Sequence, residues 1–184
     1  MGSERRRALP VLAALLLGAS GPPSTLDQFE QALAAQPSAT AALGQWCAAR
    51  HLAPDPQIRA AVISGRTNDP PGDLRRILDL SGDDRMGYRH VRLTCGGKLL
   101  SEAHNWYATG RLTPEMNRTL DDTDTPFGRV AAPLRFTRER LAGERGAADY
   151  CPRGTVLSHR ALLRLPDGAA LAYVVECYTA ANLE

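Results

Sequence analysis

Residues 88–107, YRHVRLTCGGKLLSEAHNWY, decide the fold class of this sequence. From Tyr88 to Thr94 the residues alternate in character, which is typical of a strand with two different faces. The segment Cys95–Lys98 contains two glycines and predicts a tight turn. Leu99–Tyr107 then predicts a second strand, rich in aromatic and apolar residues. We expect these residues to form an antiparallel hairpin.

A second hairpin is predicted near the end of the sequence. Residues 157–165 and 171–179 are its strands, and Pro166–Gly168 is its turn. Helices are expected from their periodicity and caps: two between 26 and 51, a short one after Asp73, and one that Thr113 caps and Pro114 opens. Because no long crossover helix joins the strands, the sheet should be antiparallel. The fold class is therefore α+β.

The overall composition is that of one soluble globular domain. The chain has 184 residues, 43% of them hydrophobic and 23% charged. A net charge of +2, from 22 basic and 20 acidic residues, is too even for a typical nucleic-acid-binding surface. We therefore expect no nucleic-acid partner.

The first twenty residues have the layout of a secretory signal peptide. Arg5–Arg7 precede the apolar run Leu9–Leu17, and small residues follow up to Ser20. The run is far shorter than the roughly 20 residues that span a bilayer. We expect residues 1–20 to be removed, leaving a single domain, 21–184, in the periplasm or outside the cell and not in the membrane. The alternative is an N-terminal extension of a cytoplasmic protein.

The four cysteines are far apart and form no CxxC pair, so a zinc site built on them is not expected. In an exported protein they would form two disulfides, and three pairings remain open. The four histidines also lack the helical spacing of metal-binding motifs, which predicts no metal site; they are His51, His90, His104 and His159.

Two charged residues lie on strand faces that should be buried. Arg89 shares its face with Val91 and Leu93, and Glu176 lies in an almost continuous apolar strand. A buried charge needs a partner. One hypothesis is a structural ion pair between Arg89 and Glu176, or a register that exposes one of them. The other is a ligand cavity, in which Arg89 binds a carboxylate and Glu176 accepts from a hydroxyl or handles a proton.

Other patterns are weaker. Glu102, His104 and Trp106 share one face of a strand, so His104 is a candidate base, although a single strand histidine is more often structural. The sequence contains no G-x-S-x-G elbow and no Walker or Rossmann glycine pattern. Serine hydrolases and nucleotide-binding enzymes are therefore disfavoured.

Several segments, taken in order, resemble the chorismate pyruvate-lyase family over the C-terminal half of the chain. They are residues 88–93, 100–107 (LSEAHNWY), 111–116 (RLTPEM), 123–130 (TDTPFGRV), 159–168 (HRALLRLPDG) and 174–183 (VVECYTAANL). The resemblance implies a single antiparallel sheet flanked by helices, with an internal ligand pocket and no cofactor.

The resemblance also implies a reaction and its residues. The family converts chorismate to 4-hydroxybenzoate and pyruvate, a reaction connected with ubiquinone biosynthesis. Arg89 would bind the carboxylate of the ring, Glu176 would bind the 4-hydroxyl and assist proton transfer, and Phe127 and Gly128 would close the pocket, with His104 as a further contact. The expected partner is a small aromatic or cyclohexadiene carboxylate, bound by a monomer. The alternatives are a non-catalytic exported binder of a small aromatic acid, and a disulfide-stapled structural domain in which Arg89 and Glu176 pair.

Overall fold

The computed structural model describes residues 22–63 and 69–184. The predicted signal peptide, 1–20, and the cleavage point near Gly21 lie outside the described residues. In the part of the chain that is described, no helix is long and apolar enough to cross a membrane.

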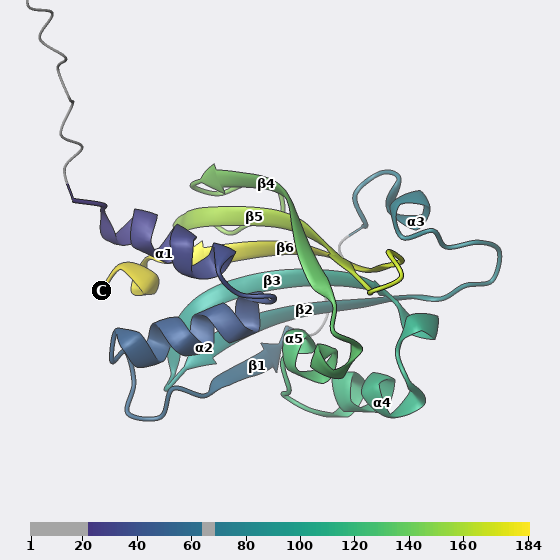
Figure 1. Cartoon of the computed structure of the whole chain (residues 1–184), viewed down its shortest axis with the longest axis horizontal. Coiled ribbons are helices and arrows are strands. Elements are labelled where there is room, and N and C mark those ends of the chain that lie inside the picture. Colours follow the sequence, from purple (N-terminus) through teal and green to yellow (C-terminus); the bar gives the residue numbers. More distant parts are fainter. Residues whose placement is uncertain (1–21, 64–68) are drawn as a thin grey trace, which may run out of the picture.

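The fold is built on one antiparallel sheet, as the two hairpins predict (Figure 1). Its strand order is β1-β2-β3-β6-β5-β4. The central pair is β3 and β6, which joins the predicted hairpins β2–β3 and β5–β6. The strands are β1 (Ile58–Val62), β2 (Met86–Cys95), β3 (Lys98–Ala108), β4 (Thr137–Arg145), β5 (Thr155–Arg164) and β6 (Ala170–Thr179).

The helices are short, and several begin at the caps that the sequence offers. The side chain of Ser38 accepts a hydrogen bond from the backbone of Ala41 and starts α2, and Thr113 does the same for Met116 at the start of α4. The bounds are α1 (Thr25–Ala34), α2 (Ala39–Ala49), α3 (Leu74–Ile77), α4 (Pro114–Asp122) and α5 (Phe127–Val130), with 3-10 turns η1 (Thr109–Arg111), η2 (Ala132–Leu134) and η3 (Ala180–Leu183).

Both faces of the sheet are covered, but by different elements. The first face packs against α1, α2, α4 and α5, and we call it the helical face. The second face packs against α3 and the loop that carries Tyr150 and Cys151, and we call it the loop face. Because side chains alternate along β6, Val174, Glu176 and Tyr178 point to the helical face. Burial on both faces explains the nearly unbroken apolar run of β6.

The two edge strands, β1 and β4, have no counterpart in the sequence predictions. β4 has the sequence TRERLAGER, and most of its residues are exposed. Charged side chains on an edge strand prevent further strand pairing, but they also remove the apolar pattern by which a strand is recognised. β1 is only five residues long.

All four cysteines are paired, which is the arrangement that the sequence predicts if the protein is exported. One disulfide joins Cys47 in α2 to Cys95 in β2 and the other joins Cys151 to Cys177 in β6. The first fastens a helix to the helical face, and the second fastens the Tyr150 loop to the loop face. Each bridge therefore holds a covering element onto a different side of the sheet.

Candidate functional site

A small cavity of about 40 Å³ lies between the helical face and the helices α2 and α5. Its polar lining includes Asn105 and Glu176 from the sheet and Ser38 and Thr40 from the start of α2. Its remaining lining is mostly apolar: Ala39, Val91, Leu93, Ala103, Phe127, Gly128, Phe136, Leu163 and Val174. A water molecule occupies about 30 Å³ in the liquid, so this inner cavity has room for about one water.

A much larger open groove, of about 680 Å³, adjoins the inner cavity. The two share four lining residues: Ser38, Thr40, Gly128 and Phe136. The groove is lined by α2, β1 and the α5–η2 segment, and it carries two exposed arginines, Arg129 and Arg135. Its volume lies within the range of small-molecule sites, roughly 300 to 1,000 Å³.

Gly128 allows the wall between cavity and groove to be thin. A Cβ atom at this position would lie 2.9 Å from Thr40 Oγ1 and 3.1 Å from Ser38 Oγ. The close approach of α5 to the start of α2 therefore favours a glycine here, because a larger residue would force Thr40 or Ser38 to shift. The structure brings Gly128, Phe127 and Glu176 together at one cavity, where the family resemblance places them.

Glu176 is neutralised by groups of the protein itself. Its Oε2 pairs with Arg138 of β4 and accepts a hydrogen bond from the Tyr178 hydroxyl at 2.9 Å. The side chains of Arg138 and Glu176 are 6% and 7% exposed. Because a buried charge is costly without a partner, this pair is what allows a carboxylate at the cavity. A structural ion pair was one hypothesis from the sequence, but the partner is Arg138 and not Arg89.

His159 extends this polar cluster. Its Nδ1 lies 3.0 Å from Arg138 NH2, and its Nε2 is buried without a hydrogen-bond partner among the described residues. Burial lowers the pKa of His159 from 6.5 to about 4, although the charge of Glu176 opposes the shift. The imidazole is therefore neutral at pH 7 and accepts the Arg138 hydrogen bond through Nδ1.

Arg89 is buried, as the hypothesis of a buried cation requires, but it is directed at the backbone. Its NH1 donates to the carbonyl of Thr125 at 2.7 Å and its NH2 to the carbonyl of Thr123 at 2.6 Å. It holds the loop that leads to Phe127, and it is not among the residues that line the inner cavity. Arg89 is therefore a positioning residue for the cavity wall, and burial lowers its pKa.

His104 lies on the loop face, across the sheet from the cavity. In the β3–β6 register His104 is opposite Val175, whereas Glu176 is opposite Ala103. The structure therefore does not bring His104 together with Glu176, Phe127 and Gly128 at the cavity.

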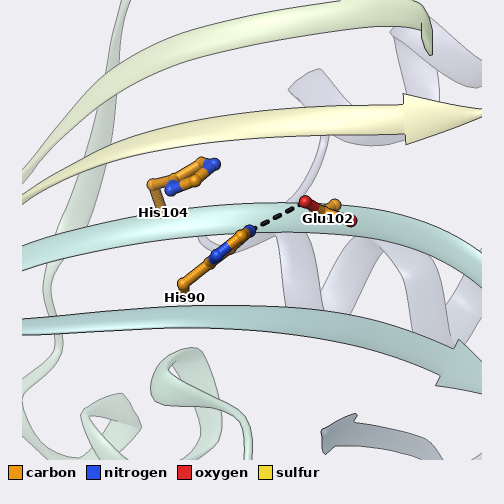
Figure 2. A group of neighbouring side chains, drawn as sticks. All are labelled: His90, Glu102 and His104. Carbon is orange, nitrogen blue, oxygen red and sulfur yellow. Dashed lines mark hydrogen bonds and ion pairs between the residues drawn. The ribbon is translucent and has the colours of Figure 1, made fainter. Parts of the chain in front are cut away.

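His104 belongs instead to a cluster with His90 and Glu102 (Figure 2). All three side chains are buried. His90 Nε2 lies 2.8 Å from Glu102 Oε1, and the two imidazole rings stack with their centroids 4.0 Å apart. Our sequence reasoning missed this cluster because it tested the histidines for helical spacing only. The signal was present in the hairpin: Glu102 and His104 are two apart on one strand, and His90 is opposite His104 on the next.

Comparison with known proteins establishes a family. No protein-family profile matches the chain. The uncharacterized protein y4mC of Sinorhizobium fredii (strain NBRC 101917 / NGR234) is 35% identical over 175 residues, which cover 85% of this chain and 74% of y4mC. This chain belongs to the y4mC family.

Two solved structures share the fold of this chain. The effector domain of PhnF from Mycobacterium smegmatis superposes with a TM-score of 0.57 at 12% identity, covering 78% of this chain and 88% of that domain. Full-length PhnF gives 0.58 at 12% identity over 81% of this chain, which spans 66% of PhnF. These similarities confirm the predicted chorismate lyase-like fold, and at this identity they concern the fold alone.

Proposed function

We propose that this protein is a small-molecule-binding domain for a small aromatic carboxylic acid, held across the inner cavity and the adjoining groove. The observation that supports the proposal most is that the inner cavity and the groove adjoin and share lining residues. A mostly apolar cavity lined in part by the buried Glu176 adjoins a groove lined in part by the exposed Arg129 and Arg135. An aromatic acid with a hydroxyl group matches this order of polar, apolar and cationic surfaces.

The volumes favour a ligand that lies mainly in the groove. The inner cavity, at about 40 Å³, is too small for an aromatic ring, whereas the groove, at about 680 Å³, is large enough. The hydroxyl end of the ligand would enter the cavity and contact Asn105 or Glu176. The carboxylate would remain at the groove arginines, because a guanidinium binds a carboxylate through two parallel hydrogen bonds.

This arrangement differs from the one that the chorismate lyase resemblance implies in the residues that bind the carboxylate, whereas the hydroxyl would lie near Glu176 in both. In that arrangement Arg89 binds the carboxylate, but here both of its terminal nitrogens already donate to backbone carbonyls. A carboxylate would have to displace these bonds. The Oε2 atom of Glu176 is also already engaged by Arg138 and by the Tyr178 hydroxyl. We therefore favour binding without catalysis.

Chorismate lyase activity is the second candidate. It is favoured by the shared position of Glu176, Phe127 and Gly128 at one cavity. The PhnF structure that matches the chain is described as an effector domain, which agrees better with ligand binding.

The protein's compartment is part of the proposal. We infer that the mature chain works outside the cytoplasm, where disulfides persist, because both pairs of cysteines are bonded. N-terminal sequencing of protein from the native host should then begin near Gly21. A Met1 terminus on cytosolic protein would contradict this.

Calorimetric titration tests the binding function. 4-Hydroxybenzoate should bind, 4-hydroxybenzamide should bind at least tenfold more weakly, and the double variant Arg129→Gln, Arg135→Gln should lose this preference for the acid. Arg153→Gln, a change at an exposed arginine that does not line the groove, is the matched control. Incubation with chorismate distinguishes the candidates: release of 4-hydroxybenzoate, seen by its absorbance, would establish the lyase instead.

A further inference from the structure

We propose that His90, Glu102 and His104 form a binding site for one divalent transition-metal cation, with zinc as the test metal. The site lies on the loop face, so it is separate from the cavity and does not depend on the proposed ligand. One candidate ligand atom from each side chain lies within 4.8 Å of the other two. Two imidazoles and a carboxylate are a donor set that zinc and related metals use in proteins.

Strand geometry places the three donors on one surface. Glu102 and His104 are two residues apart on β3, so they point to the same face, and His90 is opposite His104 in the β2–β3 register. His90 is 6% exposed, Glu102 is 9% exposed and His104 is 1% exposed. A carboxylate buried beside two imidazoles gains from a cation that binds all three.

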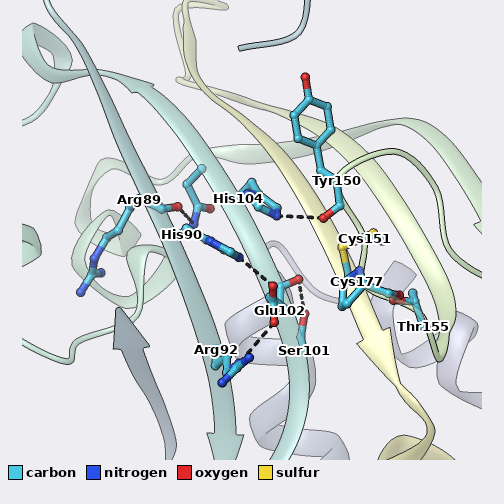
Figure 3. A network of polar contacts seen from close by, with 12 residues as sticks. Arg89, His90, Arg92, Ser101, Glu102, His104, Tyr150, Cys151, Thr155 and Cys177 are labelled. Atoms are coloured by element: carbon cyan, nitrogen blue, oxygen red, sulfur yellow. Dashed lines mark hydrogen bonds and ion pairs between the residues drawn. A yellow bond between two sulfur atoms is a disulfide. The ribbon is translucent and has the colours of Figure 1, made fainter. Parts of the chain in front are cut away.

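The hydrogen bonds around the cluster resemble the outer shell of a metal site (Figure 3). His104 Nδ1 lies 2.9 Å from the Tyr88 hydroxyl and its Nε2 lies 3.0 Å from the Tyr150 carbonyl. A metal-bound histidine usually keeps a hydroxyl or carbonyl partner on its second nitrogen, so either nitrogen of His104 can bind metal while the other stays oriented. The Tyr150 loop is itself held by the neighbouring disulfide to Cys177.

An arginine contacts the carboxylate of the cluster, and a bound metal cation would have to tolerate its charge. Arg92 is the cation that faces the cluster. Its Nε contacts Glu102 Oε2 at 3.2 Å, but its side chain is 56% exposed, and Oε1 is directed at His90.

Binding requires a small closure. A point central to three atoms that lie at most 4.8 Å apart is within about 2.8 Å of each, whereas Zn–N and Zn–O distances are about 2.0 to 2.2 Å. The His90 and His104 rings are stacked, so at least one ring must also turn about its χ2 angle. The buried Nδ1 of His90 has no hydrogen-bond partner among the described residues, so its ring loses nothing on that side when it turns.

The test is zinc titration of the untagged, disulfide-bonded chain after treatment with chelator, followed by calorimetry. We expect one zinc per chain in the wild type. Glu102→Gln keeps the shape of the side chain but removes its charge. It should weaken zinc binding by at least tenfold, because loss of an outer-shell partner alone costs that much and Glu102 is a proposed direct ligand. His51→Gln, at an exposed histidine, should bind zinc like the wild type.

A second variant and an optical signal keep the test valid if Glu102→Gln does not fold. Arg92→Gln removes an exposed cation from the cluster and should tighten zinc binding several-fold.

In a Trp46→Phe background, Trp106 is the remaining tryptophan, and its ring stacks on His104 at 5.8 Å between centroids. Cu²⁺ should quench its fluorescence saturably and a chelator should restore it. Absence of saturable zinc binding, or equal affinity in the wild type, Glu102→Gln and Arg92→Gln, would overturn the proposal.

Discussion

Replacement of Arg138 by methionine tests whether the buried ion pair supports the cavity. The change keeps most of the side-chain length and leaves the Glu176 carboxylate, 7% exposed, without its cation. Removal of one partner from a buried pair costs about 3 to 5 kcal/mol, because the other charge stays desolvated. That is a large part of the roughly 5 to 15 kcal/mol by which a domain is stable.

Urea denaturation followed by tryptophan fluorescence measures the effect. With a slope of about 2 kcal/mol per molar urea, Arg138→Met should lower the midpoint by roughly 1.5 to 2.5 M. The double variant Arg138→Met, Glu176→Gln should regain at least half of the loss, because the buried charge is removed and the amide oxygen still accepts from Tyr178.

An exposed ion pair that also includes a residue of β4 is the matched control. Arg164 and Glu139 pair at 2.6 Å, but their side chains are 39% and 49% exposed. Arg164→Met should therefore cost less than about 1 kcal/mol. The reasoning is refuted if Arg138→Met is as stable as Arg164→Met, or if Glu176→Gln gives no recovery in the double variant.

Three further predictions concern the cavity wall, the loop face and pH. Gly128→Ala should clash with Thr40 Oγ1 and lower stability by about 1 to 3 kcal/mol, and Thr40→Ala in the same chain should restore most of it, as thermal melts would show. Replacement of Cys151 and Cys177 by alanine should lower the free energy of unfolding in urea by about 3.5 kcal/mol, because the disulfide closes a loop with a sequence separation of 26. An unchanged free energy of unfolding would mean that the disulfide is dispensable. The pKa of His159 is about 4 in the folded protein and ordinarily 6.5, so the folded state favours the neutral imidazole. This preference contributes fully to stability above pH 6.5 and is lost as the pH falls from 6.5 to 4. The urea midpoint should therefore fall less over this pH range in His159→Phe than in the wild type.

The central hairpins follow from the sequence because their signals are local. Gly96 and Gly97 have positive φ angles of 53° and 87°, as the predicted tight turn requires, and alternation fixes the faces of the strands on either side. The helix caps Ser38 and Thr113 also act within three residues of their own positions. Such features need no knowledge of the tertiary structure.

The site was only partly predictable because its contacts are long-range. Glu176 is correctly predicted to be buried, but its partner Arg138 lies on an edge strand whose charged sequence hides it. Arg89 is correctly predicted to be buried as well, yet its partners are backbone carbonyls, which carry no sequence signal. The disulfide pairing likewise depended on the spatial arrangement and not on spacing.

An amide NMR titration of the ¹⁵N-labelled protein with 4-hydroxybenzoate tests the binding site most directly. Binding at the proposed position predicts saturable shifts at Thr40 and Gly128, which line both cavity and groove, and at the side-chain amide of Asn105. Amides on the loop face, such as that of Tyr150, should stay unchanged. Saturable shifts confined to the loop face, or no saturable shift at Thr40, Gly128 and Asn105, would contradict the account.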